Sequence, residues 1–267
     1  MFQSPGPIIC QWGFFTLRWY AVMIALGFLA ALWAAAPLAK RMELDYEKAS
    51  NGIFIVFISG IIGARLYYCA LRWDYYIQNL IEIPQTWHGG LSIHGGIIAG
   101  VLASIWYCRK AKLPILKSLD YWTCLVPLAQ GIGRWGNFFN SEAYGAPVSD
   151  DFWLKLYIPP NCRLPQFASN SYYHPTFLYE SVWNILLFLF LYFYASKKLA
   201  NYPGLAFCTY LAGYSLGRII IEPIRIDSVA NFMNIPVPLL ISALTLALSL
   251  CLALYLFKRT KAKAQST

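Results

Sequence analysis

Two glycine-rich segments hold the side chains best suited to chemistry in an otherwise apolar chain. The first runs from His88 to Gly96 (HGGLSIHGG) and places a histidine before each of two glycine pairs. Glycines let a backbone approach a ligand closely, and consecutive N–H groups bind anions. His94 also opens a predicted helix, whose N-terminus favours negative charge. We therefore expect His94 and Gly95 to contribute to an anion site; the alternative is that the glycines serve close helix packing.

The second segment runs from Gly133 to Glu142 (GRWGNFFNSE) and carries an arginine, two asparagines and a glutamate. If it is helical, Arg134, Asn137 and Asn140 share one face, because they are spaced by three residues. An arginine fork matches the geometry of a phosphate group, and asparagine amides donate to phosphate esters. The segment therefore predicts a phosphate site. The alternative is a structural salt bridge between Arg134 and Glu142.

A third polar group lies near the end of a later apolar run. Its members are spaced by four, four and three residues, which keeps them on one helical stripe; they are Tyr214, Arg218, Glu222 and Arg225. Arg218 lies inside the apolar run, so it must face the protein interior or the lipid headgroups, and Glu222 is its natural partner. Pro223 should unwind the helix and orient Arg225 outward. The alternative is that both arginines extend to interfacial water.

Two further residues stand at the ends of predicted helices. Tyr20 follows Trp19 at the start of the first apolar run and suits either an aromatic belt at the membrane surface or a functional role. His174 precedes Pro175, which suits the first turn of a helix, and Glu180 follows within that run. We expect His174 to be a structural or interfacial residue, with catalysis as the alternative.

The composition indicates that these groups belong to a polytopic membrane protein. Of the 267 residues, 58% are hydrophobic and only 12% are charged, whereas soluble domains carry about 25% charged residues. The net charge of +9 would suggest nucleic acid as a partner of a soluble protein. Here most Lys and Arg residues lie in short links between apolar runs, so we expect a lipid bilayer and no nucleic acid.

The cysteines give no sign of a metal or a cofactor. There are 7 of them, and none forms a CxxC pair or accompanies histidine at the spacing of a metal site. Most lie in or beside apolar runs, where a free cysteine behaves as a small hydrophobic residue. We therefore expect neither metal nor cofactor.

The apolar runs predict an all-α fold with seven transmembrane helices in one integral membrane domain over residues 1–267. A spanning helix needs about 20 residues. The predicted spans are Trp19–Leu38, Gly52–Leu71, Ile93–Tyr107, Leu119–Gly131, Thr176–Ala195, Gly204–Glu222 and Ile235–Phe257. The third and fourth are short and merge with the two glycine-rich segments. Irregular backbone at membrane depth is tolerated only inside protein or beside a wet cavity.

The loop charges orient the helices with the N-terminus outside and the C-terminus inside. In this orientation the inner loops hold most of the 21 basic residues and nearly all the lysines, as the positive-inside rule expects. The outer residues 137–173 are rich in proline and aromatic residues and predict a periplasmic cap between the fourth and fifth spans, with a short interfacial helix around Phe152–Tyr157.

In this topology every polar group described above lies at the outer half of the membrane. An arginine-rich, glycine-lined pocket at that level suits the phosphate of an anionic lipid from the outer leaflet. Histidine, tyrosine and carboxylates nearby offer acid–base chemistry.

The ordered motifs resemble those of the bacterial prolipoprotein diacylglyceryl transferase family. They are Trp-Tyr at the first span, HGGLSxHGG, GRxGNFxNxE, HPxxxYE at the fifth span and GYxxxRxxxE in the sixth, and they run from residue 19 to about residue 225. The resemblance implies an enzyme of the bacterial inner membrane. Such an enzyme moves the diacylglyceryl group of phosphatidylglycerol to the lipobox cysteine of a prolipoprotein, releases glycerol phosphate and so begins lipoprotein maturation.

The resemblance also implies roles for particular residues. Arg134 would bind the lipid phosphate and Arg218 would be a second essential cation, while His88 would be less critical than His94. Positions important in the family are matched by His94, Tyr20, Asn137, Glu142 and Gly145. We expect the catalytic group to be His94, Arg218, Tyr20 and Glu142. We expect the substrate-binding group to be Arg134, Asn137, Asn140, Gly95, Gly145, Tyr214 and Arg225.

The chemistry fits these side chains. A free thiol with a pKa of about 8.5 is only slightly ionised at neutral pH, so a base such as His94 would help. Arg134 and Arg218 would stabilise the departing phosphate in a water-poor pocket. Two competing interpretations are a transporter or channel for an anionic solute and an intramembrane serine protease. The first should show related halves and a polar route across the membrane, and the second a Ser/His pair at membrane depth; the sequence shows neither.

Overall fold

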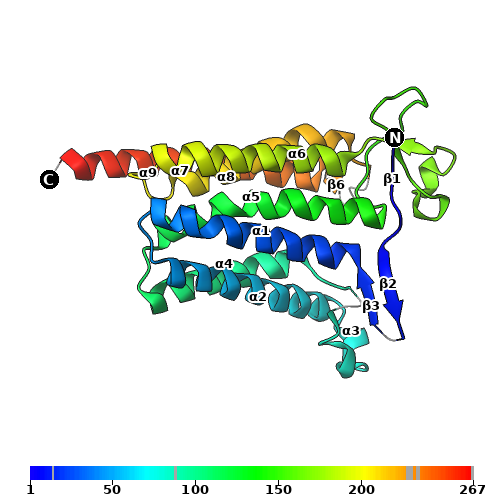
Figure 1. The fold of residues 1–267 in the computed structure, drawn as a ribbon, viewed down its shortest axis with the longest axis horizontal. Helices are drawn as coiled ribbons and strands as arrows, with labels where there is room; N and C mark the ends of the chain where they lie inside the picture. The colour runs from blue at the N-terminus through cyan, green and yellow to red at the C-terminus, as the bar shows by residue number, and fades with distance from the viewer. Residues whose placement is uncertain (14, 87–88, 227–230, 233–234, 266–267) are drawn as a thin grey trace. The chain divides into compact units, whose positions relative to one another are not determined.

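The structure is a computed structural model of residues 1–267, which describes all of them except 14, 87–88, 227–230, 233–234 and 266–267 (Figure 1). The chain forms two compact units. One comprises Met1–Leu38 and Asp120–Thr267, and the other comprises Ala39–Leu119. The single domain expected from the sequence therefore stays a prediction.

The first unit is built on long apolar helices, of which α6, α8 and α9 run side by side (Figure 1). Its helices, two of which extend across the boundary into the other unit, are α1 (Trp19–Arg41), α5 (Ile115–Asn140), α6 (Thr176–Leu189), α8 (Leu205–Ile221) and α9 (Val237–Gln265). A π-helical turn, η5 (Phe190–Ala195), continues α6 into the short α7 (Ser196–Lys198). The 3-10 turn η6 (Glu222–Ile224) follows α8 directly.

The second unit is a pair of packed helices, α2 (Tyr46–Leu71) and α4 (Ile93–Ala111), with the short α3 (Trp73–Tyr76) and η1 (Leu80–Glu82) between them in the chain. Glycines allow the two helices to touch. A side chain at Gly63 would lie 2.7 Å from the carbonyl oxygen of Gly95, and one at Gly95 would meet the backbone of Gly63. Gly95 thus makes the close helix contact that the sequence left as the alternative to an anion site.

The length and hydropathy of its helices confirm that the chain is a membrane protein of largely helical structure. Within the described part of the chain, four helices are long and apolar enough to cross a membrane; they are Trp19–Arg41, Tyr46–Leu71, Thr176–Lys198 and Val237–Lys263. The remaining predicted spans correspond to α4, α5 and α8, which do not meet the same criterion. The count of seven spans and their orientation stay predictions.

Helix α5 corrects the expected boundary of the fourth span. The span was expected to end at Gly131 and to merge with irregular backbone, whereas the helix continues to Asn140. The glycines in this stretch provide room for neighbouring side chains. A Cβ at Gly131 would lie 2.9 Å from the Ile185 side chain, and one at Gly136 would lie 2.7 Å from the Tyr20 ring.

Short strands depart from the all-α expectation. They form a hairpin of β2 (Ile8–Trp12) with β3 (Phe15–Arg18), a pair of β6 (Asn231–Phe232) with β7 (Ile235–Pro236), and a three-stranded sheet. In that sheet β4 (Leu156–Tyr157) pairs in parallel with β1 (Phe2–Gln3) and antiparallel with β5 (Tyr172–Tyr173).

The predicted interfacial helix at Phe152–Tyr157 is wrong, because this stretch forms a turn followed by β4. Pairing with β1 and β5 satisfies its backbone, and the strand buries Leu156 in an aromatic core. The core residues of the cap are Phe138, Tyr144, Leu156, Ile158, Tyr173 and Phe177. Long-range strand pairing of this kind leaves little periodic signal in so short a segment.

Candidate functional site

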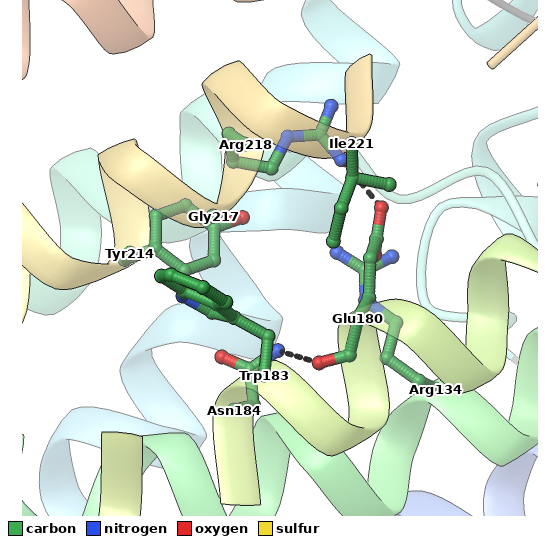
Figure 2. Close-up of a pocket in the computed structure, with 8 residues that line it drawn as sticks. All are labelled: Arg134, Glu180, Trp183, Asn184, Tyr214, Gly217, Arg218 and Ile221. Atoms are coloured by element: carbon green, nitrogen blue, oxygen red, sulfur yellow. Dashed lines mark hydrogen bonds and ion pairs between the residues drawn. The ribbon is translucent and has the colours of Figure 1, made fainter. Parts of the chain in front are cut away.

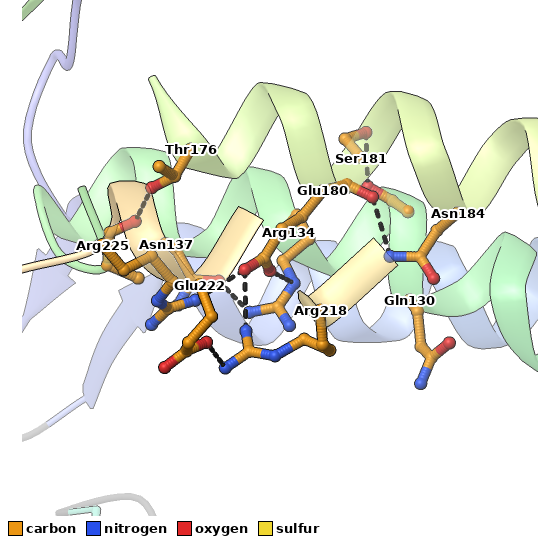
Figure 3. A network of polar contacts seen from close by, with 12 residues as sticks. Gln130, Arg134, Asn137, Thr176, Glu180, Ser181, Asn184, Arg218, Glu222 and Arg225 are labelled. Atoms are coloured by element: carbon orange, nitrogen blue, oxygen red, sulfur yellow. Dashed lines mark hydrogen bonds and ion pairs between the residues drawn. The ribbon is translucent and has the colours of Figure 1, made fainter. Parts of the chain in front are cut away.

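The polar centre of the first unit is Glu180, a buried carboxylate on α6 surrounded by three arginines (Figure 3). Its side chain is 3% exposed. Oε1 accepts hydrogen bonds from Nη1 of Arg218 at 2.8 Å and from Nη1 of Arg225 at 2.6 Å. Oε2 forms an ion pair with Nε of Arg134. One carboxylate thereby holds guanidinium groups from α5, α8 and the turn after α8.

Glu222 completes this arginine cluster, which we define as Arg134, Glu180, Arg218, Glu222 and Arg225. Its buried carboxylate pairs with Nη2 of Arg218, one helical turn earlier, and this confirms the pairing expected from the spacing of four. Three guanidiniums and two carboxylates leave the cluster with a net charge of +1. Since charges away from water need compensation, the cluster is suited to receive one further anion.

Helix packing through small residues brings the arginines to Glu180. Ser181 Oγ donates to the carbonyl of Gly131 at 2.8 Å, which joins α6 to α5. On the other side Trp183 Nε1 donates to the carbonyl of Gly213 at 2.9 Å. A side chain at Gly217 would lie 2.3 Å from Trp183. The glycines of α8 therefore make the space in which this tryptophan joins α6 to α8.

Gly145 fixes the backbone that carries Arg225. Its N–H donates to the carbonyl of His174 at 3.0 Å, and it forms a β-bridge with Arg225. A Cβ at Gly145 would lie 2.8 Å from Cβ of His174 and 2.9 Å from the Thr176 side chain. Gly145 thus serves close backbone packing, and a direct contact with substrate stays a prediction.

The expected outward orientation of Arg225 is wrong. Helix α8 ends before Pro223, as predicted, and η6 follows. The Arg225 side chain is nevertheless only 11% exposed and pairs with Glu180. The bridge to Gly145 holds its backbone at the cluster, so the side chain turns inward instead of reaching interfacial water.

Glu142 is bound by the asparagines of α5, Asn137 and Asn140, and not by Arg134. Oε1 of Glu142 accepts hydrogen bonds from Nδ2 of Asn137 at 2.9 Å and from Nδ2 of Asn140 at 3.2 Å. Oδ1 of Asn137 lies 3.5 Å from Nη1 of Arg134. Among the residues that the structure describes, Arg134 pairs with Glu180 and not with Glu142, so the alternative of an Arg134–Glu142 salt bridge is not formed. Asn137 instead links the exposed Glu142 to the arginine cluster.

Tyr20 lies beside these residues on α1. Its ring packs against the backbone of Gly136, its side chain is 38% exposed, and its hydroxyl is within range of the charges of Glu142 and Arg134. A tyrosine hydroxyl on an exposed residue in this place is able to position a polar group of a ligand.

A small cavity adjoins the arginine cluster (Figure 2). Its lining residues are Arg134, Glu180, Trp183, Asn184, Tyr214, Gly217, Arg218 and Ile221. Its volume of about 10 Å³ is space for about one water molecule. The structure therefore places the expected residue Tyr214 at the same cavity as the two arginines assigned to phosphate.

The two remaining expected residues, His94 and Gly95, belong to the other unit. The His94 side chain is exposed at the start of α4, and its ring lies 6.4 Å from that of Tyr67. His88 lies outside the described residues. The geometry of this unit shows no further partner for His94 among its described residues.

A buried arginine that the sequence left without a role organises the second unit. Arg65 of α2 is 5% exposed, and its guanidinium lies 5.2 Å from the centre of the Tyr76 ring. It donates to four backbone carbonyls of the segment that leads to α4, those of Glu82, Ile83, Gly89 and Gly90, at 2.6 to 3.0 Å. Arg65 therefore binds the backbone of Glu82, Ile83 and the first glycine pair, Gly89 and Gly90, ahead of α4.

His174 occupies the edge of the cap. Its Nδ1 lies 3.0 Å from the hydroxyl of Tyr179, and its ring packs edge-on against Phe152 at 5.1 Å. Burial lowers the pKa of His174 below its ordinary value of 6.5, so the ring is neutral at pH 7. These contacts support the structural role expected for this residue.

The residue that sequence reasoning missed is Glu180. Two signals were available: it is an acidic residue within an apolar run, and it closes the HPxxxYE motif. An intramembrane carboxylate is costly and marks a functional site with a cationic partner. The sequence, however, does not tell which arginines come to it from other helices.

Comparison with known proteins agrees with the motifs. The family model described as prolipoprotein diacylglyceryl transferase matches residues 7–255. A phosphatidylglycerol–prolipoprotein diacylglyceryl transferase of Parasynechococcus marenigrum (strain WH8102) is 46% identical over 231 residues, which cover 85% of this chain and 82% of the relative. The enzyme of that name from Fervidobacterium nodosum is 45% identical over 82% of this chain and 75% of its own length.

A third relative of the same name, from Thermosynechococcus vestitus (strain NIES-2133 / IAM M-273 / BP-1), is 41% identical over 85% of this chain and 84% of its own length. The match to the family model extends from before the first span through the arginine cluster into the last helix. The chain belongs to the prolipoprotein diacylglyceryl transferase family.

Proposed function

We propose that this chain transfers the diacylglyceryl group of phosphatidylglycerol to the lipobox cysteine of a prolipoprotein, the first step of bacterial lipoprotein maturation. It is a transferase of lipoprotein biosynthesis by family. The observation that carries the proposal is the arginine cluster, in which three guanidiniums meet two buried carboxylates and keep one positive charge in excess.

The reaction replaces a carbon–oxygen bond by a carbon–sulfur bond. The cysteine sulfur attacks the glyceryl carbon that bears the phosphate, and the bond between this carbon and the phosphate oxygen breaks. The bonding electrons leave on the phosphate, so glycerol phosphate departs as an anion. The thiol proton passes to a base. The products are a thioether and glycerol phosphate.

The arginine cluster supplies the electrostatic part of this reaction. Arg134 and Arg218 bind the lipid phosphate and stabilise the extra negative charge that develops on the leaving group. Glu180 fixes the directions of the guanidiniums before the lipid arrives. The cavity beside the cluster is too small for a phosphate, so the lipid enters by exchanging part of the arginine–glutamate pairing for arginine–phosphate pairing.

The remaining roles follow the motif positions. His94 is the proposed thiol base, and His174 is its competitor. Tyr20, Asn137 and Glu142 position the reacting groups, while Asn140, Tyr214 and Arg225 line the lipid site. Gly145 acts through close backbone packing beside Arg225, and Gly95 through the close packing of α2 on α4, as their contacts support.

The proposed setting is the bacterial inner membrane, where the chain is one integral domain. Seven helices cross the bilayer with the N-terminus outside and the C-terminus inside. Residues 137–173 form the periplasmic cap. Four strongly apolar helices and the concentration of lysines in the predicted inner loops support this topology.

The test is an assay of thioether formation. The full chain in detergent is mixed with phosphatidylglycerol and a peptide that carries a lipobox, and the peptide mass is measured. We expect the mass to rise by one diacylglyceryl group, and a peptide with serine in place of the lipobox cysteine should not change. A chain that leaves the cysteine peptide unmodified under these conditions contradicts the proposal and favours the transporter alternative.

A further inference from the structure

A buried hydrogen-bond acceptor without a donor faces the cavity of the arginine cluster. It is Oδ1 of Asn184, whose side chain is 3% exposed and lines the cavity. The other end of the amide is satisfied, because Nδ2 donates to the carbonyl of Glu180 at 2.7 Å (Figure 2). Oδ1 has no hydrogen-bond partner among the described residues. Buried polar atoms are nearly always paired, so this oxygen points to a donor that enters the cavity.

A second acceptor of the same kind lies at the matching level of α5. Gln130 Nε2 donates to the hydroxyl of Tyr210 at 3.0 Å, while its buried Oε1 is unpaired within the described part of the chain. Gln130 precedes Arg134 by four residues, and Asn184 follows Glu180 by four. Each amide is therefore one helical turn from a member of the Arg134–Glu180 ion pair.

The packing of α5 on α6 places the two amides on the same side of that ion pair. Arg134 meets Glu180, and the Gly131 carbonyl meets Ser181 three residues back along α5. The room left by Gly131 is filled by Ile185. The residue numbers of the contacts fall along α5 as they rise along α6, so the two helices are antiparallel. Residues 130 and 184 thus both lie one turn beyond the ion pair.

The geometry points to Asn184, assisted by Gln130, as the residue that recognises the glycerol headgroup of the lipid by accepting hydrogen bonds from it. This inference rests on the proposed function. The cavity has room for about one hydroxyl group, so when the arginines hold the phosphate, one hydroxyl of the headgroup esterified to it enters the cavity. This hydroxyl is the donor that Oδ1 of Asn184 lacks, and Gln130, which lies outside the cavity lining, offers its unpaired Oε1 to a second hydroxyl of the headgroup. The amides are specificity-determining residues that distinguish a glycerol phosphodiester from one without hydroxyls.

The class of ligand follows from the hydrogen-bonding type of the two unpaired atoms. Both unpaired atoms are acceptors, so they would repel an oxygen of a carboxylate or of a second phosphate instead of binding it. A neutral hydroxyl satisfies them without adding charge next to Glu180. An ordinary water would also satisfy them, and the experiment therefore has to separate a water from a headgroup hydroxyl.

The experiment compares two lipids with the same acyl chains in the thioether assay. Phosphatidylglycerol is the substrate, and phosphatidylmethanol, which keeps the phosphodiester charge but has no hydroxyl, is the competitor. For Asn184→Leu we expect KM for phosphatidylglycerol to rise about tenfold with kcat nearly unchanged, because the lost hydrogen bond serves ground state and transition state alike. The inhibition constant of phosphatidylmethanol should stay within about twofold.

Gln130→Leu provides an independent second variant if Asn184→Leu does not fold, and we expect the same direction of change. Ser181→Ala is the matched control: it removes a buried hydrogen bond between α5 and α6 but no acceptor of the cavity, and it should leave the ratio of the two constants unchanged. The inference is overturned if the amide variants raise KM and the inhibition constant in parallel, or if they change neither, as a bound water alone would predict. Thioether formation by the unaltered chain keeps the proposed function independent of either outcome.

Discussion

Glu180 and Arg225 form an ion pair with 2.6 Å between Oε1 and Nη1, although they are 45 residues apart in sequence. The pair joins the first turns of α6 to the turn that follows α8. It also makes Glu180 the common partner of three guanidiniums. The arginine cluster is therefore organised by Glu180, and Glu180 is the first residue to test.

Replacing Glu180 by glutamine should damage both stability and activity. Glutamine keeps the size of the side chain but leaves three partly buried arginines with Glu222 alone, and removing one partner of a buried ion pair costs up to about 3–5 kcal/mol. We expect Glu180→Gln to lower the melting temperature in detergent by several degrees and to reduce thioether formation at least about 100-fold. Thermal unfolding and the peptide assay measure the two effects.

The matched control for this variant is Glu142→Gln. Glu142 is exposed and accepts its hydrogen bonds from asparagine amides, so its replacement should leave the melting temperature nearly unchanged. A Glu180→Gln protein as stable as the unaltered chain would show that Glu180 does not hold the arginines together.

Replacing Arg134 by lysine should impair transfer while the chain still folds. Lysine keeps the positive charge but lacks the planar fork that binds a phosphate through two parallel hydrogen bonds. We expect kcat/KM to fall about 100-fold or more, which corresponds to ~2.7 kcal/mol of lost transition-state stabilisation. Arg109→Lys is the control, because Arg109 is exposed at the end of α4. Normal turnover of phosphatidylglycerol by Arg134→Lys would refute the assignment.

His94 and His174 compete for the role of thiol base, and alanine variants made in parallel separate them. His174 is packed by Phe152 and Tyr179, so His174→Ala should mainly lower the melting temperature. His94 is exposed, so His94→Ala should leave stability unchanged and reduce transfer at neutral pH. Since the thiol of a peptide ionises by itself near pH 8.5, His94→Ala should recover part of its activity as the pH rises to 9. The same recovery in His174→Ala, with His94→Ala fully active, would reverse the assignment.

The sequence predicted the parts of this site that depend on local spacing. The pairing of Arg218 with Glu222 is a contact across one helical turn, and the end of α8 before Pro223 follows from the missing N–H of proline; both are confirmed. The convergence of three helices on Glu180 could not be predicted, because it depends on which glycines let the helices approach. Strand β4 was predicted to be part of a helix because its pairing with the N-terminal β1 is long-range and leaves little periodic signal in so short a segment.

Arg65 is a buried arginine bound by backbone carbonyls, and its conservative variant gives the last test. Its three guanidinium nitrogens donate to four backbone carbonyls, whereas a lysine has one nitrogen with three donors and no fork. We expect Arg65→Lys to leave at least one buried carbonyl unpaired, at a cost of about 1–3 kcal/mol, and to speed hydrogen exchange at the amides of Ile83 and Gly89. Arg72→Lys, at an exposed position just after α2, is the control. Unaltered exchange at these amides in Arg65→Lys would mean that the segment before α4 is held by other contacts.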